Sequence, residues 1–532
     1  MGKIKTVHLV WSSLLLYLTY LLSKLIQFDN LSSFANDSVH YLVMARHYSP
    51  WVDESRAISS AWLLQDFPPF FPWLLAFTGT AHSLLYAHLL VAGLGLAGLY
   101  FYYLLSSRWL KSQGLALFPL LIFALSPGFI LGLQGILSES LYFFLFIIFV
   151  LLYTPTRNNS NTKIVIAGLL LAAILLTRTI GIALWMAILT QAFFSSISQK
   201  RVNYQPIVIA AISLLVYFLL MTIWGPVKES HYLDILIRYL GDKDLYQIGT
   251  GTEHFFSAAS QLTSLLDSWT TFWIIYWRAD GFSSSYYVMI VLLLLSTSGL
   301  LIRLAKNKYD AWYVLFYLLI LLIWPYPGQM VRLLFPIMPL LLIYGGYAVT
   351  KFAYLKKFSY RKNIFPSILY IFILVTVIPS HAFIQTRANM AAEKQMIPVY
   401  EIFRSADLGV ANRDLRLQNQ MLKDFARIKD VVSEDEKILY FLPSYLAILS
   451  NRQGVKAPSP VDGRAYRLIS EKNHASYIFL TRLHPRNTRP DFNALRGAEY
   501  IRSGTELVWC SQLEDGTLAS CLYRIKDPTT DP

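Results

Sequence analysis

The sequence predicts an α-helical polytopic membrane protein with about eleven spanning helices and a small C-terminal α/β domain. Of its 532 residues, 55% are hydrophobic and only 15% are charged, whereas soluble globular proteins carry about 25% charged residues. The deficit comes from long uncharged runs such as 141–152, 288–301 and 314–324. A bilayer offers backbone groups no hydrogen-bond partner, so these runs must be helices or closed barrels, and they lack the alternation of barrel strands.

Eleven apolar segments are candidates for crossing the bilayer, which takes about 20 residues per helix. The first segment follows Lys3 and Lys5 and lacks a small-residue cleavage site, so we interpret it as an uncleaved first helix rather than a signal peptide. The predicted spans are 7–27, 82–105, 114–133, 137–154, 164–177, 181–197, 205–224, 284–303, 311–324, 333–350 and 365–383.

The net charge of +14 lies mostly in short loops between spans, so it indicates membrane orientation and not a nucleic-acid partner. Every second loop is basic, which predicts a cytoplasmic N-terminus and an extracytoplasmic C-terminal domain. The basic loops contain Lys3 and Lys5; Arg108 and Lys111; Arg157 and Lys163; Lys200 and Arg201; Arg303, Lys306 and Lys308; and Lys351, Lys356, Lys357, Arg361 and Lys362.

The chain divides into a membrane domain, 1–383, with outer loops 28–81 and 225–270, and an outer domain, 384–532. In the first outer loop, 39–48 and 70–80 are amphipathic enough to form helices at the membrane interface. The outer domain mixes helical segments at 390–404 and 418–432 with strand-like segments at 437–442, 476–481 and 506–510.

The two cysteines, Cys510 and Cys521, predict a disulfide across a β-hairpin. They flank Asp515-Gly516, a strong signal for a two-residue turn. Pairing Glu514 with Thr517 places the cysteines opposite each other, at a hydrogen-bonded pair with a Cα separation of about 5.5 Å. An oxidising outer compartment permits the bond, and two buried free thiols are the alternative.

Two acidic residues near the predicted outer surface are candidate catalytic groups. Asp37 stands about ten residues after the first span, and its alternative role is to cap a helix beginning at Ser38. Glu139 stands where the third span turns into the fourth, and its alternative is a carboxylate favoured by the helix dipole. A charge facing lipid at that depth costs about 2.5 kcal/mol or more, so we expect Glu139 to face a polar cavity.

Two arginines, Arg178 and Arg332, lie at span ends on the outer side, where positive charge is otherwise sparse. A pair of guanidinium groups suits a phosphate or pyrophosphate, which arginine binds in a forked geometry. We expect both to face a shared outer cavity open to the bilayer, with Lys228 as an additional cation. The histidines, including His40, have no paired metal spacing, and the chain has no glycine-rich phosphate loop.

Several segments resemble, in order, those of the GT-C glycosyltransferases, specifically the protein O-mannosyltransferase and lipid A aminoarabinose transferase group. Asp37-Ser-Val-His-Tyr41-Leu-Val-Met-Ala45 resembles the acidic motif of that group's first outer loop, and Phe67-Pro68-Pro69-Phe70-Phe71-Pro72 is similar to the segment that follows it. Later segments also match in order: Leu176-Thr-Arg178-Thr-Ile-Gly181, Arg332-x-x-x-Pro336-x-x-Pro339 and Ile438-Leu-Tyr…Leu449-Ser-Asn-Arg452.

The resemblance implies an inverting enzyme that moves a sugar from a polyprenyl-phosphate carrier to an acceptor on the outer face of the membrane. It implies that Asp37 is the catalytic base and that Tyr41 and Arg332 contact the carrier phosphate, while Glu139 is suited to a supporting role. The acceptor and the sugar stay open.

The first loop departs from the group's pattern at three positions: Ser38 replaces a Glu, His40 replaces a common Arg, and Phe67 replaces a Lys. The first change removes one acid of a two-acid metal site, so a divalent metal is left open and no cofactor is otherwise predicted. The other two changes remove the usual phosphate cradle unless Arg46, Lys228 or Arg178 substitutes. The alternatives to an enzyme are a transporter or lipid-carrier flippase, which would show inverted repeats and broken helices at the midplane, and a membrane scaffold that binds a partner.

Overall fold

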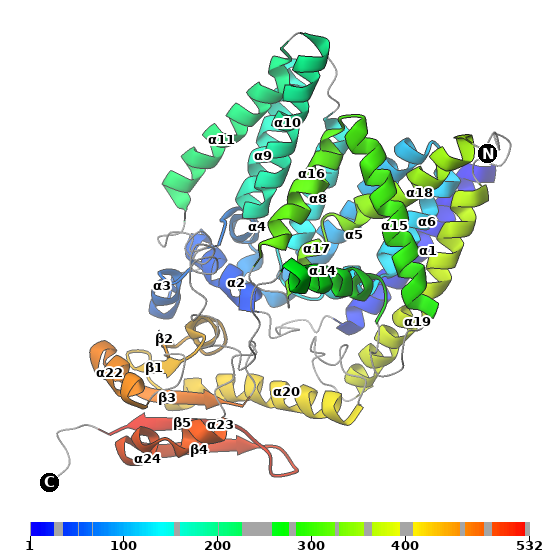
Figure 1. Ribbon diagram of the computed structural model, residues 1–532. Helices are drawn as coiled ribbons and strands as arrows, with labels where there is room; N and C mark the ends of the chain where they lie inside the picture. Colours follow the sequence, from blue (N-terminus) through cyan, green and yellow to red (C-terminus); the bar gives the residue numbers. More distant parts are fainter. Residues whose placement is uncertain are drawn as a thin grey trace.

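A computed structural model gives the arrangement of the chain (Figure 1). Helical segments form one large body, and a five-stranded sheet with its helices lies beneath it. The N-terminus and the C-terminal sheet lie at opposite ends of the molecule. The structure describes residues 2–25, 36–51, 53–65, 67–153, 160–200, 202–225, 258–275, 284–324, 329–355, 364–393, 408–457, 463–482 and 492–526.

Each of the eleven predicted spans contains a helix in the described part of the chain. Among the described residues, five helices are long and apolar enough to cross a membrane, and five more are shorter but apolar. The helices in these spans are α1 (Gly2–Leu25), α5 (Leu84–Leu110), α6 (Gln113–Leu125), α7 (Pro127–Gly132), α8 (Glu139–Leu152), α9 (Asn161–Thr177), η2 (Thr179–Gly181), α10 (Ile182–Gln199), α11 (Tyr204–Trp224), α15 (Ser284–Ala305), α16 (Tyr309–Leu322), α18 (Met338–Leu355) and α19 (Ile364–Glu393).

The predicted span 114–133 is two helices and not one, which corrects the sequence assignment. Ser126 separates α6 from α7 in an extended conformation, and its Oγ accepts a hydrogen bond from the backbone N–H of Phe129 at 3.3 Å. Pro127 occupies the first helical position, where its missing N–H costs nothing. A serine cap followed by proline is therefore a helix start that the apolar composition concealed.

Short helices occupy the segments between spans on the side of the sheet. The predicted interface helices are present as α2 (Asn36–Tyr48) and α4 (Phe70–Phe77). Because α2 begins at Asn36, Asp37 lies inside its first turn and not before it, so the alternative role of Asp37 as the cap of a helix beginning at Ser38 does not apply. The remaining short helices are α3 (Arg56–Trp62), η1 (Thr80–His82), α14 (Ala258–Trp273) and α17 (Met330–Leu334).

The C-terminal sheet has the strand order β2-β1-β3-β5-β4, with β2, β1 and β3 parallel and the β5 and β4 pairings antiparallel. All three predicted strands are present, and most of predicted helix 390–404 lies outside the described residues. The elements are α20 (Leu408–Val431), β1 (Lys437–Tyr440), α21 (Pro443–Tyr445), η7 (Leu446–Ser450), β2 (Gln453–Lys456), α22 (Gly463–Asn473), β3 (Ala475–Thr481), α23 (Phe492–Gly497), α24 (Glu499–Gly504), β4 (Thr505–Gln512) and β5 (Leu518–Ile525).

The predicted disulfide between Cys510 and Cys521 is confirmed, and the two residues are opposite each other on β4 and β5. Their Cα atoms are 4.1 Å apart, closer than the expected 5.5 Å. The expected closing pair of the hairpin is wrong, because the Leu513 N–H donates to the Thr517 carbonyl and a register shift follows Ser511. This irregularity in the turn changes the type of pair that the cysteines occupy.

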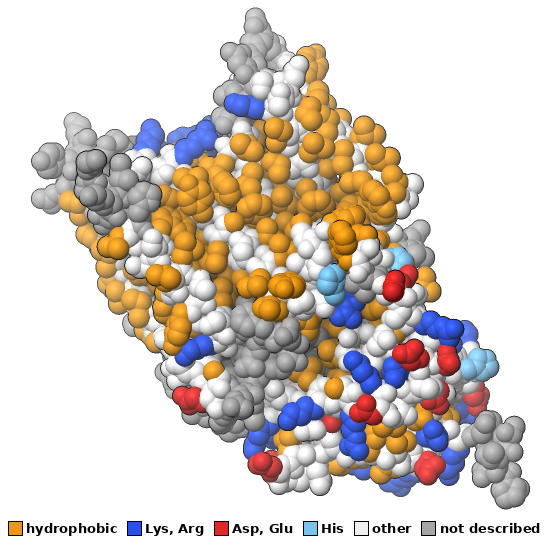
Figure 2. Space-filling view, turned by 180° about the vertical axis from the view of Figure 1, so that it is seen from behind, with side chains coloured by type: hydrophobic (Ala, Val, Ile, Leu, Met, Phe, Trp, Pro, Cys, Tyr) orange, Lys and Arg blue, Asp and Glu red, His pale blue; other side chains and the backbone are white. Residues whose placement is uncertain are grey.

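Hydrophobic side chains cover most of the helical body in Figure 2, whereas charged side chains gather over the C-terminal sheet. Large apolar side chains are accordingly exposed along α10, α11 and α19, among them Phe193, Leu215 and Phe372. A soluble surface does not carry an apolar area of this extent, but a lipid-facing one does. The chain is a helical membrane protein.

Candidate active site

Four charged side chains from distant parts of the sequence meet at the end of the helical body that faces the sheet. Asp37 is in the first turn of α2, Glu139 begins α8, Arg178 follows α9, and Arg332 lies in α17. Arg332 Nη2 donates to Asp37 Oδ2 at 2.5 Å, and Arg332 Nε donates to Glu139 Oε1. Arg178 Nη1 lies 2.5 Å from the same Glu139 oxygen. These four residues are called the charge cluster below.

Glu139 is the centre of the charge cluster. Its side chain is 1% exposed and one oxygen is shared by two guanidinium groups. The other oxygen, Oε2, is buried and makes no hydrogen bond with the described residues; the same holds for the hydroxyls of Ser38 and Ser140. Buried polar atoms are normally paired, so the unpaired oxygen of Glu139 makes the charge cluster a candidate site.

Asp37 and Arg332 form the accessible edge of the charge cluster, with side chains that are 19% and 29% exposed. Burial by itself would raise the pKa of Asp37, but the charge of Arg332 and its hydrogen bond outweigh this and lower the pKa below its usual value. Asp37 is therefore a carboxylate at neutral pH. Arginine has five N–H donors, and the contacts with Asp37 and Glu139 use two of them.

Tyr41 lies one turn after Asp37 on α2 and is 3% exposed. Its hydroxyl is 2.9 Å from Ser138 Oγ, which also accepts from Arg178 Nη1 at 3.4 Å. The ring packs edge-on against Phe67 and Phe71, with centroids 5.1 and 5.0 Å away. These contacts fix the Tyr41 hydroxyl beside the charge cluster, and Ser138, which the sequence analysis missed, links it to Arg178.

His40 faces the C-terminal domain. Its Nδ1 is 3.1 Å from Ser444 Oγ, and Gln65 Nε2 donates to the same hydroxyl at 3.2 Å. The ring stacks on Phe67 at 5.5 Å. Helix α2 is thus tied to α21 of the C-terminal domain three residues after Asp37, a connection for which Ser444 gave no sequence signal.

The remaining predicted ligands are placed differently. Arg46 Nε donates to the Ala81 carbonyl at 3.1 Å, so this arginine is engaged with the backbone of its own outer segment. Lys228 lies outside the described residues. Among the described residues, no group of three or more His, Cys, Asp or Glu side chains is arranged to hold a metal ion.

The sequence matches no protein-family model, and no curated protein matches it. Solved structures do match. An oligosaccharyltransferase from Archaeoglobus fulgidus, tethered with an acceptor peptide containing the NVT sequon, is 12% identical with a TM-score of 0.52, over 97% of this chain and 74% of that chain. AglB from the same organism, in complex with an inhibitory peptide and a dolichol-phosphate, is 11% identical with a TM-score of 0.52, over 98% and 75%.

This chain has a GT-C-type fold. A third structure, ArnT from Cupriavidus metallidurans bound to undecaprenyl phosphate, is 12% identical with a TM-score of 0.48 over 99% of both chains. At 11% to 12% identity the likeness to the archaeal structures concerns the course of the chain and not its side chains. A fold does not by itself determine function. The charge cluster, which is formed by this chain's own side chains, is therefore the candidate for its chemistry.

Proposed function

We propose that the protein transfers a sugar from a polyprenyl-phosphate carrier to an acceptor on the outer face of a cell membrane. The observation that carries the proposal is the charge cluster, in which Arg332 joins Asp37 to Glu139 beside a second arginine. A carboxylate base and guanidinium groups are the two kinds of group that a transfer from a lipid phosphate needs. The archaeal neighbour AglB was solved with a dolichol-phosphate, which supports a carrier of this class.

In the proposed step, an acceptor O–H or N–H group attacks the anomeric carbon of the sugar. The acceptor proton passes to Asp37, the bond between the anomeric carbon and the phosphate oxygen breaks, and that oxygen leaves with the electron pair. Direct attack from the opposite side inverts the anomeric centre. Arg332 and Arg178 stabilise the charge on the departing polyprenyl phosphate, because a guanidinium binds phosphate oxygens in a forked geometry.

The ion pair between Asp37 and Arg332 links proton acceptance by Asp37 to the binding of the donor. While Arg332 pairs with Asp37, it lowers the pKa of that carboxylate and weakens it as a base. A lipid phosphate competes for the same guanidinium donors. Arrival of the donor then frees Asp37, raises its pKa and prepares it to take the acceptor proton.

The proposed orientation places the charge cluster and the C-terminal domain outside. Arg178 and Lys163 mark opposite ends of the helix segment that contains α9, and Arg108 Nη1 reaches the Leu151 carbonyl at the end of α8 away from Glu139. Basic residues of the loops therefore gather at the end opposite the charge cluster. The positive-inside rule assigns that end to the cytoplasm. The proposed location is the inner (plasma) membrane, where a polyprenyl-phosphate donor would be met.

A donor assay tests the proposed function. The purified protein is incubated with polyprenyl-phosphate sugars of undecaprenyl and dolichyl type and with peptide, lipid and glycan acceptors, and released polyprenyl phosphate is measured. We expect acceptor-dependent release with at least one donor, with inverted configuration in the product. The rival function is lipid transport, and movement of the intact carrier across proteoliposomes without any release of polyprenyl phosphate would establish it instead.

A further inference from the structure

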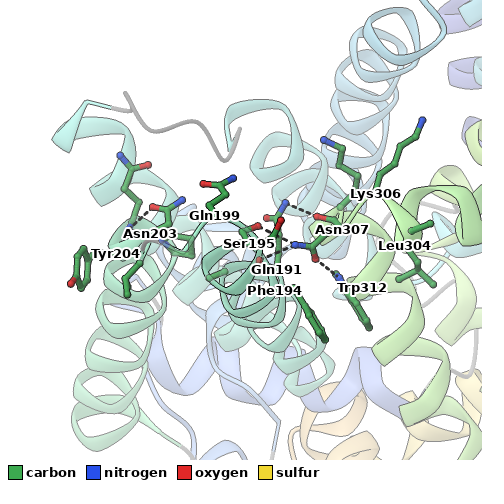
Figure 3. A pocket seen from close by; sticks show the side chains of 17 residues that line it. Gln191, Phe194, Ser195, Gln199, Asn203, Tyr204, Leu304, Lys306, Asn307 and Trp312 are labelled. Atoms are coloured by element: carbon green, nitrogen blue, oxygen red, sulfur yellow. Dashed lines mark hydrogen bonds between the residues drawn. The ribbon is translucent and has the colours of Figure 1, made fainter.

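A cavity lined by many polar side chains lies at the end of the helical body away from the charge cluster. It has a volume of about 940 Å³ and is lined by the last turns of α10, the first turn of α11 and the connection between α15 and α16 (Figure 3). Its volume is within the range of ligand pockets, roughly 300–1,000 Å³. Nothing in the proposed sugar transfer uses this cavity.

Asn307 organises the floor of the cavity. Its Nδ2 donates to the Gln191 carbonyl at 3.1 Å and to Ser195 Oγ at 3.0 Å, while its Oδ1 accepts from Trp312 Nε1 at 2.9 Å. The residue has a positive φ of 49°, a conformation that asparagine tolerates better than most residues. Figure 3 shows Asn307 between α10 on one side and Trp312 on the other, so these elements form a fixed wall.

Gln191 lines this cavity and carries a buried acceptor that is unpaired among the described residues. Its Nε2 donates to the Asn307 carbonyl at 3.0 Å, which sets the orientation of the amide. The side-chain oxygen, Oε1, is then left without a hydrogen-bond partner among the described residues. It is buried, and Gln191 as a whole is 5% exposed. A buried carbonyl oxygen without a partner is unfavourable, so an N–H or O–H group of a ligand that reaches it gains a hydrogen bond that the protein leaves unmade.

Two cations, Lys306 and Lys308, line the same cavity. Lys306 Nζ donates to Tyr347 Oη at 2.9 Å, which uses one of the three N–H groups of its ammonium. The cavity therefore offers positive charge for an anionic group together with an acceptor for a hydrogen-bond donor.

The surroundings of the cavity place it at the membrane surface. It lies at the ends of membrane-spanning helices, and Phe194, Ile197 and Val202 beside it are 44%, 60% and 52% exposed. Phe194 stacks on Trp312, with ring centroids 5.5 Å apart and planes at 8°. Aromatic rings at helix ends mark the head-group level of a bilayer, and the exposed apolar side chains give acyl chains a surface to lie against.

We propose that this cavity binds the head group of a phospholipid from the leaflet at this end of the molecule. The lipid phosphate pairs with Lys306 and Lys308, and an N–H or O–H of the head group donates to Gln191 Oε1. Phosphatidylethanolamine and phosphatidylglycerol both carry a phosphate and such a donor. Phosphatidylcholine carries the phosphate but its trimethylammonium group has no N–H.

Thermal unfolding of the delipidated full-length protein in detergent tests the proposal with four additives. We expect phosphatidylglycerol and phosphatidylethanolamine to raise the midpoint at equal concentration, because a ligand that binds only the folded state stabilises it. Phosphatidylcholine and glycerol 3-phosphate should produce a much smaller shift. An equal shift with phosphatidylcholine overturns the head-group assignment, and an equal shift with glycerol 3-phosphate shows a site for a free phosphate ester instead of a lipid.

Two variants locate the site. Lys306→Gln with Lys308→Gln removes the cations, and Ser198→Trp, at an exposed position of the lining, blocks the cavity without changing charge. Both are expected to lose the lipid-induced shift. The matched control is Lys163→Gln with Lys111→Gln, which removes two exposed charges outside the lining and should retain it. A shift that survives in the first two variants, or disappears in the control as well, overturns the proposal.

Discussion

Two buried arginine–carboxylate clusters lie at opposite ends of α8, and they differ in how completely their polar atoms are paired. At the far end from Glu139, Tyr309 Oη donates to the Tyr153 carbonyl, and the adjacent Asp310 pairs with Arg303. Arg303 Nε and Nη2 bind the two oxygens of Asp310 at 2.6 and 2.7 Å.

Other groups complete this second pair. Tyr344 Oη donates to Asp310 Oδ2 at 2.6 Å, and the Arg303 guanidinium lies 4.0 Å above the Trp109 ring. Both carboxylate oxygens of Asp310 thus have hydrogen-bond partners, and such a fully paired arginine–carboxylate group stabilises the folded structure. In the charge cluster, two arginines share one oxygen of Glu139 while the other oxygen is unpaired. The contrast teaches that incomplete pairing, and not burial of charge, distinguishes a candidate site.

The strongest test of this contrast is Asp37→Asn. We expect turnover to fall by about 10²–10⁴-fold, the usual effect of removing a general base, with little loss of stability because Arg332 keeps Glu139 as a partner. Turnover is measured as release of polyprenyl phosphate, and folding by thermal unfolding. Asp53→Asn, at an exposed acid of the same outer segment, is the matched control and should be unchanged. Normal turnover of a folded Asp37→Asn protein would shift the assignment to Glu139.

The second test breaks the fully hydrogen-bonded ion pair between Asp310 and Arg303. Asp310→Asn leaves the Arg303 charge buried and should destabilise the protein by about 3–5 kcal/mol, the usual effect of removing one partner of a buried ion pair. Turnover per folded molecule should stay normal, because Asp310 lies at the other end of α8. Denaturation in detergent measures the loss, and a stable but inactive Asp310→Asn protein would contradict the division between the two clusters.

A third test uses pH to read the pairing of Asp37 with Arg332. The pKa of Asp37 is lowered in the folded state, so the acid limb of kcat/KM should lie below the ordinary aspartate pKa of about 3.9. The stability from the pair is present above that ordinary value and is lost as pH falls through the lower folded pKa. Arg332→Gln removes the strongest influence that lowers the pKa of Asp37 and leaves only His40 and Arg178 to oppose burial, so the acid limb should move to higher pH. If the acid limb of kcat/KM does not move in Arg332→Gln, a group other than Asp37 determines it.

The smallest expected effect concerns the link to the C-terminal domain. Ser444→Ala removes the hydroxyl shared by His40 and Gln65 and should cost about 1 kcal/mol of stability, the typical net value of a hydrogen bond. The kcat should change little, because the carboxylate and guanidinium groups remain in place. A fall in kcat comparable to that of Asp37→Asn would instead make Ser444 part of the catalytic arrangement.

Much of the architecture follows from local signals. Uncharged apolar runs predicted the spans, because a backbone in lipid must satisfy its hydrogen bonds within one helix. The Asp515-Gly516 turn signal predicted the pairing of Cys510 with Cys521. The pairing is present although the hairpin closes at Leu513 and Thr517, because a register shift after Ser511 brings the cysteines opposite each other. The apolar composition of residues 114–133 predicted a single helix. The structure has two helices there, because Ser126 and Pro127 begin a new helix after Leu125.

The sequence by itself determined which residues are charged near the membrane surface, and it singled out Asp37, Glu139, Arg178 and Arg332. Only the tertiary structure decided that they meet: Arg332 is 295 positions from Asp37 and 193 from Glu139, and His40 is 404 positions from Ser444. Helical periodicity relates residues within a few turns, whereas contacts at these separations depend on how whole helices pack. The unpaired oxygens of Glu139 and Gln191 are likewise products of that packing, since the same side chains on a single helix would be satisfied by water.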